Sequence, residues 1–321
     1  MRVTGIDVRV VTPHQRFLWT YTRAQADVVA DSLALRREFP QELTYLGSGA
    51  ELWRAATAVQ SALLRASDLL LSDHAAELAD LARPGPVDVL DLGPGTGSAA
   101  EGLLAGLIAA GRFGGYRAVD ISPEMLTLAG ARLTAAFPAR AARLAFTVGD
   151  FRDAGPHAAR IVLLAGGTLF NLADPGALLR DLAATRNPGD LVVITTRLDT
   201  TGRAPFPPSQ PAPALPPIHR LGLDLLNLDP GWYEPERGFD PARREVWSGA
   251  RLNRPITLHL DGAHGRRVVA LHTGDLLLLY RQLFLDRAAV TALIEGSGLR
   301  LRTFHTGRSG EVAMFVADTR D

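Results

Sequence analysis

The sequence predicts an α/β fold in which a mainly parallel, doubly wound sheet lies between two layers of helices. The apolar stretch 87–92 ends in a glycine-rich loop, and a helix pattern follows it at 98–110. Strand and helix patterns then alternate as far as about residue 199, and two further strand patterns end in an acidic residue. The chain has 321 residues, more than such a sheet needs, so we expect an additional accessory domain.

The glycine-rich loop is the most informative segment of the chain. Asp91 is followed at alternate positions by Gly93, Gly95 and Gly97, where the absence of side chains lets a ligand approach the backbone. Dinucleotide sites have the spacing Gly-x-Gly-x-x-Gly instead. The segment resembles the first motif of class I S-adenosylmethionine (SAM) methyltransferases. That resemblance implies that the loop accommodates the amino-acid part and the ribose of SAM.

The next two expected strands, 117–121 and 143–148, also end in acidic residues. Asp120, followed by Ile121, can accept hydrogen bonds from both ribose hydroxyls, although dehydrogenases use an acid in the same way. The strand end Gly149-Asp150-Phe151 resembles the methyltransferase motif in which the acid accepts the adenine amino group and the next backbone group contacts the ring. Three such strand ends in this order favour SAM over a nicotinamide cofactor.

Further patterns complete the expected organisation. Strands are expected at 160–165 and 190–197, a helix at 175–185, and a β-hairpin from 256–260 and 267–272. The proline-rich stretch 200–216 favours a lid or a crossover. Four parts are expected along the chain. Residues 1–70 form a mostly helical N-terminal part of the substrate domain, extended at 3–11 and with helices from 48 and at 68–81. A SAM-binding core at 71–199 and an inserted substrate or lid domain at 200–275 follow. At 276–321, strands at 276–285 and 311–317 flank a helix at 286–297 and complete a seven-stranded core sheet whose last strand is antiparallel.

The composition excludes several classes of function. The 34 basic and 34 acidic residues balance, which gives no global attraction for nucleic acid or for an anionic membrane. Without cysteine the chain forms no disulfide and has no thiolate metal site or thiol nucleophile. No apolar run is long enough for a membrane span or a signal peptide. We therefore expect a cytoplasmic protein, monomeric or homodimeric, whose partner is a small molecule.

Three segments outside the glycine loop extend the resemblance. They are 45–53, 165–172 with its Gly-Gly-Thr-x-x-Asn-Leu sequence, and 218–227, and together they resemble the histidine-specific SAM-dependent methyltransferase family. The resemblance implies a composite substrate domain from residues 1–60 and 200–275. It also implies that Asn171 binds amino-acid backbone groups and that Tyr45 lies beside the substrate. Gly166, in the same segment as Asn171, is a further candidate cofactor-binding residue.

The acceptor site departs from the family pattern at two positions. The family holds the imidazole of histidine with a Glu and a Ser, and this chain has Leu279 and Arg281 there. Because leucine cannot accept the imidazole proton, the hypothesis is a flat aromatic acceptor, an indole or tryptophan derivative in secondary metabolism, methylated on nitrogen or carbon. Arg281 could bind an acidic group of the acceptor, or could point to solvent or to Asp286. The candidate catalytic residues are Asn171, Tyr45 and Tyr280, and the candidate acceptor-binding residues are Trp19, Tyr21, Phe170, His219, Leu279 and Arg281.

Other functions remain as alternatives. One is α-N-methylation of histidine or a similar amino acid, and another is a SAM-binding partner protein without activity. A nicotinamide dehydrogenase is disfavoured by the glycine spacing. No metal is expected, because the histidines, such as His264 and His272, share no close-spaced helix face and no acidic cluster.

Overall fold

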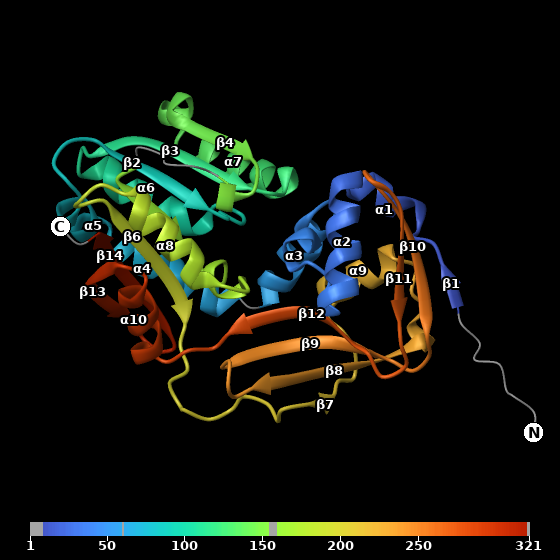
Figure 1. Cartoon of the computed structure of the whole chain (residues 1–321). Helices are drawn as coiled ribbons and strands as arrows, with labels where there is room; N and C mark the ends of the chain where they lie inside the picture. The colour runs from blue at the N-terminus through green and yellow to red at the C-terminus, as the bar shows by residue number, and fades with distance from the viewer. Residues whose placement is uncertain (1–8, 60, 154–158, 320–321) are drawn as a thin grey trace, which may run out of the picture. The chain divides into compact units, whose positions relative to one another are not determined.

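The computed structural model describes residues 9–59, 61–153 and 159–319 (Figure 1). The chain divides into two compact units, each made from two stretches of sequence. Unit 1 comprises Met1–Trp53 and Ala204–Leu283, and unit 2 comprises Arg54–Arg203 and Phe284–Asp321. Of the extended start expected at 3–11, residues 3–8 lie outside the described residues, and Arg9–Val11 form strand β1.

Unit 2 contains the expected seven-stranded sheet, in the order β13-β14-β6-β5-β2-β3-β4. Strand β14 is antiparallel to both of its neighbours, and the remaining pairs are parallel. The sequence prediction of seven strands with an antiparallel last strand is confirmed. The strands are β2 (Val87–Leu92), β3 (Phe113–Asp120), β4 (Leu144–Val148), β5 (Ile161–Leu164), β6 (Leu191–Arg197), β13 (Leu299–Thr306) and β14 (Val312–Thr319).

Helices flank this sheet (Figure 1). Apolar side chains of α4, α5, α6 and α7 form one core cluster with the central strands, whereas α8 and α10 pack against each other and against β13. Caps fix several helix starts, because side-chain oxygens of Ser122, Asp174 and Asp286 accept hydrogen bonds from first-turn N–H groups. The helices of unit 2 are α4 (Ser61–Asp73), α5 (Ala75–Leu81), α6 (Ser98–Ala109), α7 (Pro123–Ala136), α8 (Pro175–Thr185) and α10 (Arg287–Gly296). Helix α3 (Ser48–Val59) begins in unit 1 and ends in unit 2.

Unit 1 contains two smaller sheets. One has the order β12-β9-β8-β7 and is antiparallel, and the other has the order β1-β10-β11. Helix α2 packs on the hairpin β10–β11, which confirms the hairpin expected at 256–272. The elements are α1 (Gln15–Thr20), α2 (Arg23–Arg36), η1 (Gln41–Tyr45), β7 (Gln210–Pro211), α9 (Pro217–Leu225), β8 (Tyr233–Asp240), β9 (Glu245–Leu252), β10 (Ile256–Gly262), β11 (Gly265–Leu271) and β12 (Leu276–Leu283).

The structure corrects the expected C-terminal region, 276–321. Strand β12 does not complete the core sheet but pairs with β9 in unit 1. The strand next to β14 is β13, which the sequence did not indicate because Arg300 and Arg302 interrupt its apolar residues. Both guanidinium groups donate to the buried carboxylate of Asp318 on β14, which offsets the cost of placing charges there.

The structure also adds detail to two other segments, the helix expected at 68–81 and the proline-rich stretch 200–216. The helix expected at 68–81 is two helices, α4 and α5, which are separated at His74. The proline-rich stretch 200–216 contributes strand β7, whose residues Gln210 and Pro211 pair with β8 at the edge of the sheet. Proline suits this position because an edge strand does not need every backbone N–H for the ladder.

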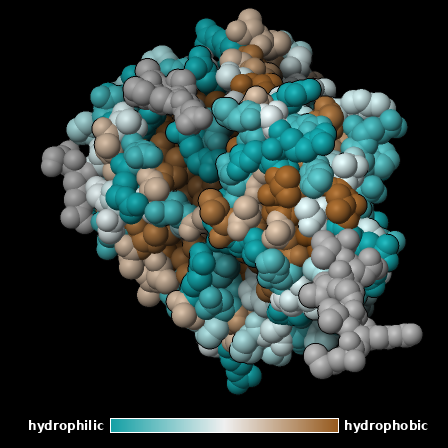
Figure 2. Space-filling model, turned by 45° about the vertical axis from the view of Figure 1, so that its right-hand side comes forward, coloured by the Kyte–Doolittle hydropathy of each residue, from teal (hydrophilic) through white to brown (hydrophobic). Residues whose placement is uncertain are grey.

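The described part of the chain contains no helix long and apolar enough to cross a membrane. On the face shown in Figure 2, hydrophilic residues cover much of the surface, and hydrophobic residues are exposed between them.

Candidate functional site

The glycine loop follows β2 and adopts a backbone that requires glycine. Gly93, Gly95 and Gly97 have φ of +72°, +58° and +76°, values that cost other residues conformational energy. A Cβ on Gly93 would lie 2.8 Å from Cγ2 of Thr168, and one on Gly97 would lie 3.2 Å from Cα of Ala129. The loop therefore forms a bend of bare backbone at the carboxyl end of β2.

Asp91 lies directly before this bend and is 1% exposed. The hydroxyl of Tyr116 donates a 2.8 Å hydrogen bond to its Oδ2, and its Oδ1 has no partner among the described residues. Burial raises the pKa of Asp91 to about 7, against the opposing hydrogen bond from Tyr116. A buried carboxylate with an unused oxygen fits a cationic partner, and the ammonium group of SAM has that chemistry.

Asp120 lies at the carboxyl end of β3, the strand next to β2. Its Oδ1 accepts a 2.9 Å hydrogen bond from the backbone N–H of Ser122. Burial raises the pKa of Asp120 to about 6, although backbone hydrogen bonds from Ser122 and Ile121 act in the opposite direction. A carboxylate at this strand end can accept hydrogen bonds from a ribose.

Asp150 follows β4 and is held by its own local turn. The backbone N–H and the Nε of Arg152 each donate a 2.9 Å hydrogen bond to Oδ1. Burial alone would raise the pKa of Asp150, but the hydrogen bonds and the charge of Arg152 lower it. An adenine amino group would therefore share this carboxylate with Arg152. The neighbouring Phe151 begins the short helix Phe151–Asp153 and is partly exposed.

The loop after β5 contacts the glycine loop. Thr168 contacts Gly93 and directs its hydroxyl towards the Gly93 carbonyl oxygen at 3.4 Å. Gly166, with φ +72°, donates its N–H to Oγ1 of Thr195 at 2.8 Å. Asn171 closes the turn with a 3.0 Å bond from its N–H to the Gly167 carbonyl oxygen. Its side-chain Oδ1 is buried and has no hydrogen-bond partner within the described part of the chain.

In unit 1, His219 and Tyr280 form a flat aromatic pair. Their ring centroids are 4.3 Å apart and the planes differ by 12°. Nδ1 of His219 lies 2.8 Å from Oγ of Ser248, and burial lowers the pKa of His219 to about 4, so the ring is neutral near pH 7. The hydroxyl of Tyr280 donates to Oε1 of Gln282 at 2.8 Å, and burial raises the pKa of Tyr280.

Arg281 is engaged within unit 1 and is 9% exposed, so the expectation that it points to solvent is wrong. Its Nη2 lies 2.8 Å from Oε2 of Glu38, and its Nη1 lies 3.8 Å from Oε2 of Glu245. The Arg281 backbone N–H donates to Oε1 of Gln41 at 3.0 Å. These partners come from a loop and a strand distant in sequence, which no local pattern could indicate. Any acidic acceptor group would compete with two carboxylates already present.

The remaining acceptor-binding candidates differ in their exposure to solvent. Trp19 is 75% exposed on α1, whereas Tyr21 is buried against the rings of Phe17 and Phe39. Phe170 in unit 2 and Leu279 in unit 1 are buried in their respective units. Tyr45 ends η1. His219 and Tyr280 form the aromatic pair that the structure brings together, whereas Tyr21, Phe170 and Leu279 are buried and Trp19 is exposed.

Several site residues were missed by sequence reasoning. Tyr116, the partner of Asp91, falls one residue before the strand expected at 117–121, although β3 begins at Phe113. A longer strand would have placed it on the same sheet face as Asp91, since β2 and β3 pair in parallel with Val89 opposite Tyr116. Ser248 carries no sequence signal of its own, because only the folded chain brings it to His219. Arg152 was also missed, although it lies only two residues after Asp150.

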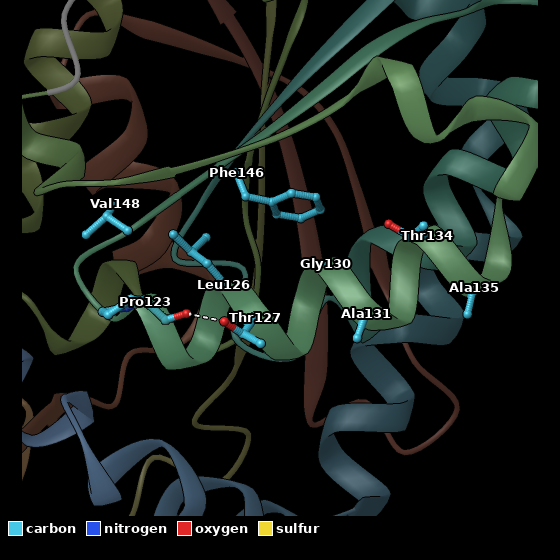
Figure 3. Close-up of a pocket in the computed structure, with 9 residues that line it drawn as sticks. All are labelled: Pro123, Leu126, Thr127, Gly130, Ala131, Thr134, Ala135, Phe146 and Val148. Atoms are coloured by element: carbon cyan, nitrogen blue, oxygen red, sulfur yellow. Dashed lines mark hydrogen bonds between the residues drawn. The ribbon is translucent and has the colours of Figure 1, made fainter.

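A groove of about 860 Å³ lies between α7 and β4 (Figure 3). Its lining is mainly apolar and contains neither Asp120 nor Asp150. In Figure 3, Phe146 and Val148 project from β4 towards the helix, and the Thr127 hydroxyl hydrogen-bonds to the Pro123 carbonyl oxygen. The lining residues are Pro123, Leu126, Thr127, Gly130, Ala131, Thr134, Ala135, Phe146 and Val148.

Comparison with known proteins gives the family. The model of the histidine-specific, SAM-dependent methyltransferase family matches residues 24–202, more than half of the chain. No curated protein matches. Similar solved structures include the CcbJ methyltransferase of Streptomyces caelestis, with 20% identity, TM-score 0.47 and coverage of 78% of this chain and 95% of that one.

Two further solved structures are similar at the same low level of identity. Magnesium protoporphyrin IX methyltransferase from Synechocystis, solved with bound S-adenosylhomocysteine, has 13% identity, TM-score 0.49 and coverage of 92% and 99%. CalS10, an amino pentose methyltransferase from Micromonospora echinaspora, has 19% identity, TM-score 0.43 and coverage of 78% and 92%. Because the family model spans the glycine loop and all three acidic strand ends, the chain belongs to the histidine-specific SAM-dependent methyltransferase family and is an enzyme that uses S-adenosylmethionine as its methyl donor.

Proposed function

We propose that the enzyme methylates a small aromatic acceptor, an indole or a tryptophan-derived metabolite of secondary metabolism, on nitrogen or carbon. The observation that carries this proposal is the flat pair of His219 and Tyr280, whose centroids are 4.3 Å apart. Burial keeps His219 neutral by lowering its pKa to about 4, so the pair offers an uncharged aromatic surface. A third planar ring can extend such a stack by about 0.5–1.5 kcal/mol beyond area burial.

We assign the cofactor to unit 2. Asp91 would hold the ammonium group, Asp120 the ribose hydroxyls, and Asp150 with Phe151 the adenine ring. Gly93, Gly95, Gly97 and Gly166 would leave backbone surface for it, and Ile121 would contact it beside Asp120. When bound, S-adenosylmethionine supplies an activated methyl group to a nucleophile. The chain therefore needs chiefly to position the acceptor and exclude water.

Asn171 is the proposed positioning group for the acceptor nitrogen. Its buried Oδ1 lacks a donor among the described residues, and an N–H of the acceptor supplies one. The same loop contacts the glycine loop through Thr168 and Gly93. A hydrogen bond from the acceptor N–H to Oδ1 would fix the direction of the nitrogen lone pair or of the ring.

The tyrosines serve as polar neighbours rather than bases in this proposal. Burial raises the pKa of Tyr280, so its hydroxyl stays protonated near neutral pH. His219, with its lowered pKa, is a weak base at the same pH. The proton released after methyl transfer therefore leaves to water, and Tyr45 and Tyr280 orient the acceptor.

A second candidate is α-N-methylation of histidine or a similar amino acid. The family description and the unpartnered Asn171 oxygen favour it, because an α-amino group also donates N–H bonds. The pairing of Arg281 with Glu38 and Glu245 opposes it, because Nη1 and Nη2 of Arg281 already face these two carboxylates.

Mass spectrometry of an acceptor panel tests both candidates. The panel contains indole, tryptophan, tryptamine and histidine, each incubated with SAM, and fragmentation locates any added methyl group on the ring or on the α-amine. We expect methylation of an indole compound and none of histidine. The variant H219A should raise the KM for the indole acceptor about tenfold, the variant H219F should largely retain it, and SAM binding should stay unchanged in both. Methylation of histidine with no reaction of any indole refutes the aromatic proposal.

A further inference from the structure

His74, Glu77 and His305 form a group of potential metal ligands in unit 2. His74 lies at the start of α5, Glu77 in the first turn of that helix, and His305 on the edge strand β13. One ligand atom from each residue lies within 4.8 Å of the other two. This arrangement joins two elements that are 228 residues apart in the chain.

The distances suit a shared cation. Nδ1 of His74 lies 3.0 Å from Oε2 of Glu77, and Nε2 of His305 lies 3.0 Å from the same oxygen. Two ligands of a tetrahedral zinc ion, each about 2.0–2.2 Å from the metal, are roughly 3.3–3.6 Å apart. Small rotations of the three side chains would therefore bring their atoms to coordination distance.

One hydrogen bond from Nε2 of His305 does not account for the three oxygen atoms that lie close to it. Its Nε2 has Oε1 and Oε2 of Glu77 at 3.1 and 3.0 Å and the hydroxyl oxygen of Thr303 at 3.0 Å. A single N–H hydrogen is directed well at only one acceptor. The rings of His74 and His305 also stack at 3.7 Å between centroids, so both present nitrogen atoms to the same carboxylate.

The side chains are accessible to an ion from solvent. The exposed fractions are 28% for His74, 37% for Glu77 and 22% for His305. Two imidazoles and one carboxylate are a common donor set for zinc, and three protein ligands leave a position for water.

We propose that His74, Glu77 and His305 bind a divalent transition-metal ion, Zn²⁺ in the first instance, as a structural clip between α5 and β13. Because the three ligands come from distant parts of the chain, the folded protein binds the ion and the unfolded chain does not hold it in this geometry. Binding should therefore raise the melting temperature. None of the three ligands belongs to the glycine loop or to the residues assigned above to the cofactor and the acceptor.

The test uses the full chain, purified without a histidine tag and stripped with a chelator. Calorimetric titration with Zn²⁺ should give one ion per chain for the wild type and for the control variant H272A, which removes an exposed histidine elsewhere. The variants H74A and E77Q should bind at least tenfold more weakly. Zn²⁺ should raise Tm by several degrees in the wild type and in H272A but not in E77Q, and Co²⁺ should give visible absorption bands typical of tetrahedral coordination.

The variant E77Q keeps the size of the side chain, so it remains informative if H74A does not fold. Equal Zn²⁺ affinity in the wild type and in E77Q would identify an adventitious ion only. No binding to the stripped wild type, or binding without any change in Tm, would overturn the structural clip.

Discussion

Replacing Gly93 with alanine tests whether the bare backbone of the glycine loop binds the cofactor. Gly93 has φ +72°, and a non-glycine residue pays about 1–2 kcal/mol for that conformation. A Cβ would also lie 2.8 Å from Cγ2 of Thr168, closer than real contacts allow. Displacing Thr168 costs roughly another 1 kcal/mol, so we expect a total effect of about 2–3 kcal/mol, equivalent to about 30–150-fold in an equilibrium constant.

The loss can be divided between folding and ligand binding. If the loop relaxes in the free variant, the cost appears when the ligand restores it, and S-adenosylhomocysteine binds more weakly. If the loop cannot relax, the cost appears in the free energy of unfolding. Isothermal titration with S-adenosylhomocysteine and urea unfolding of the same samples measure both parts.

Gly111 provides the matched control. It has φ +66° at the end of α6, and a Cβ there would meet no atom within 4 Å. The variant G111A should therefore lose about 1–2 kcal/mol of stability with no change in ligand affinity. If G93A binds S-adenosylhomocysteine within twofold of the wild type and is no less stable than G111A, the reasoning about the loop is refuted.

Three further variants test other parts of the site. For Asp91, burial raises the folded-state pKa from 3.8 to about 7. The folded protein therefore prefers the protonated carboxyl, which stabilises it at pH values below the unfolded-state pKa. This stabilisation, roughly 4 kcal/mol, is lost as the pH rises towards 7. D91N should remove this pH dependence between pH 4 and 8 and weaken SAM binding, and parallel pH profiles of the two proteins in urea unfolding would contradict it. N171A should lower kcat/KM about 10–100-fold by removing one hydrogen bond to the acceptor while leaving S-adenosylhomocysteine affinity unchanged; an equal loss in both measurements would place Asn171 at the cofactor instead. R281M removes the buried cation between Glu38 and Glu245 and leaves these carboxylates only the more exposed Arg36 and Arg243, at 3.7 and 3.5 Å. It should cost about 1–3 kcal/mol at pH 8. Since burial raises the pKa of Glu38, part of the stability should return at pH 5, and thermal unfolding with no pH-dependent recovery would speak against this cause.

The sequence predicted the cofactor half of the protein well because its signals are local. Gly93, Gly95 and Gly97 require a backbone that few other residues adopt, and all three have positive φ. Apolar strands that end in Asp91 and Asp120 also have a direct structural reason, since parallel strands buried on both faces end together at one edge of the sheet.

The acceptor half was less predictable because its side chains meet through distant contacts. Tyr21 and Leu279 are as apolar as ligand-binding residues would be, but they pack in the interior. Arg281 pairs with Glu38 and Glu245 and does not point to solvent. Strand alternation gives the side of a strand on which a residue lies, and it does not give the residue opposite.

The sequence by itself determined the α/β class, the succession of strands along the chain as far as β6, and the glycine loop with its acidic strand ends, because each depends on residues within one segment. Only the tertiary structure decided that β12 joins β9, that β13 lies beside β14, and that His74 and Glu77 meet His305. Apolar periodicity reports which face of a segment is buried, whereas the pairing partner depends on free energy summed over contacts between segments far apart in the chain.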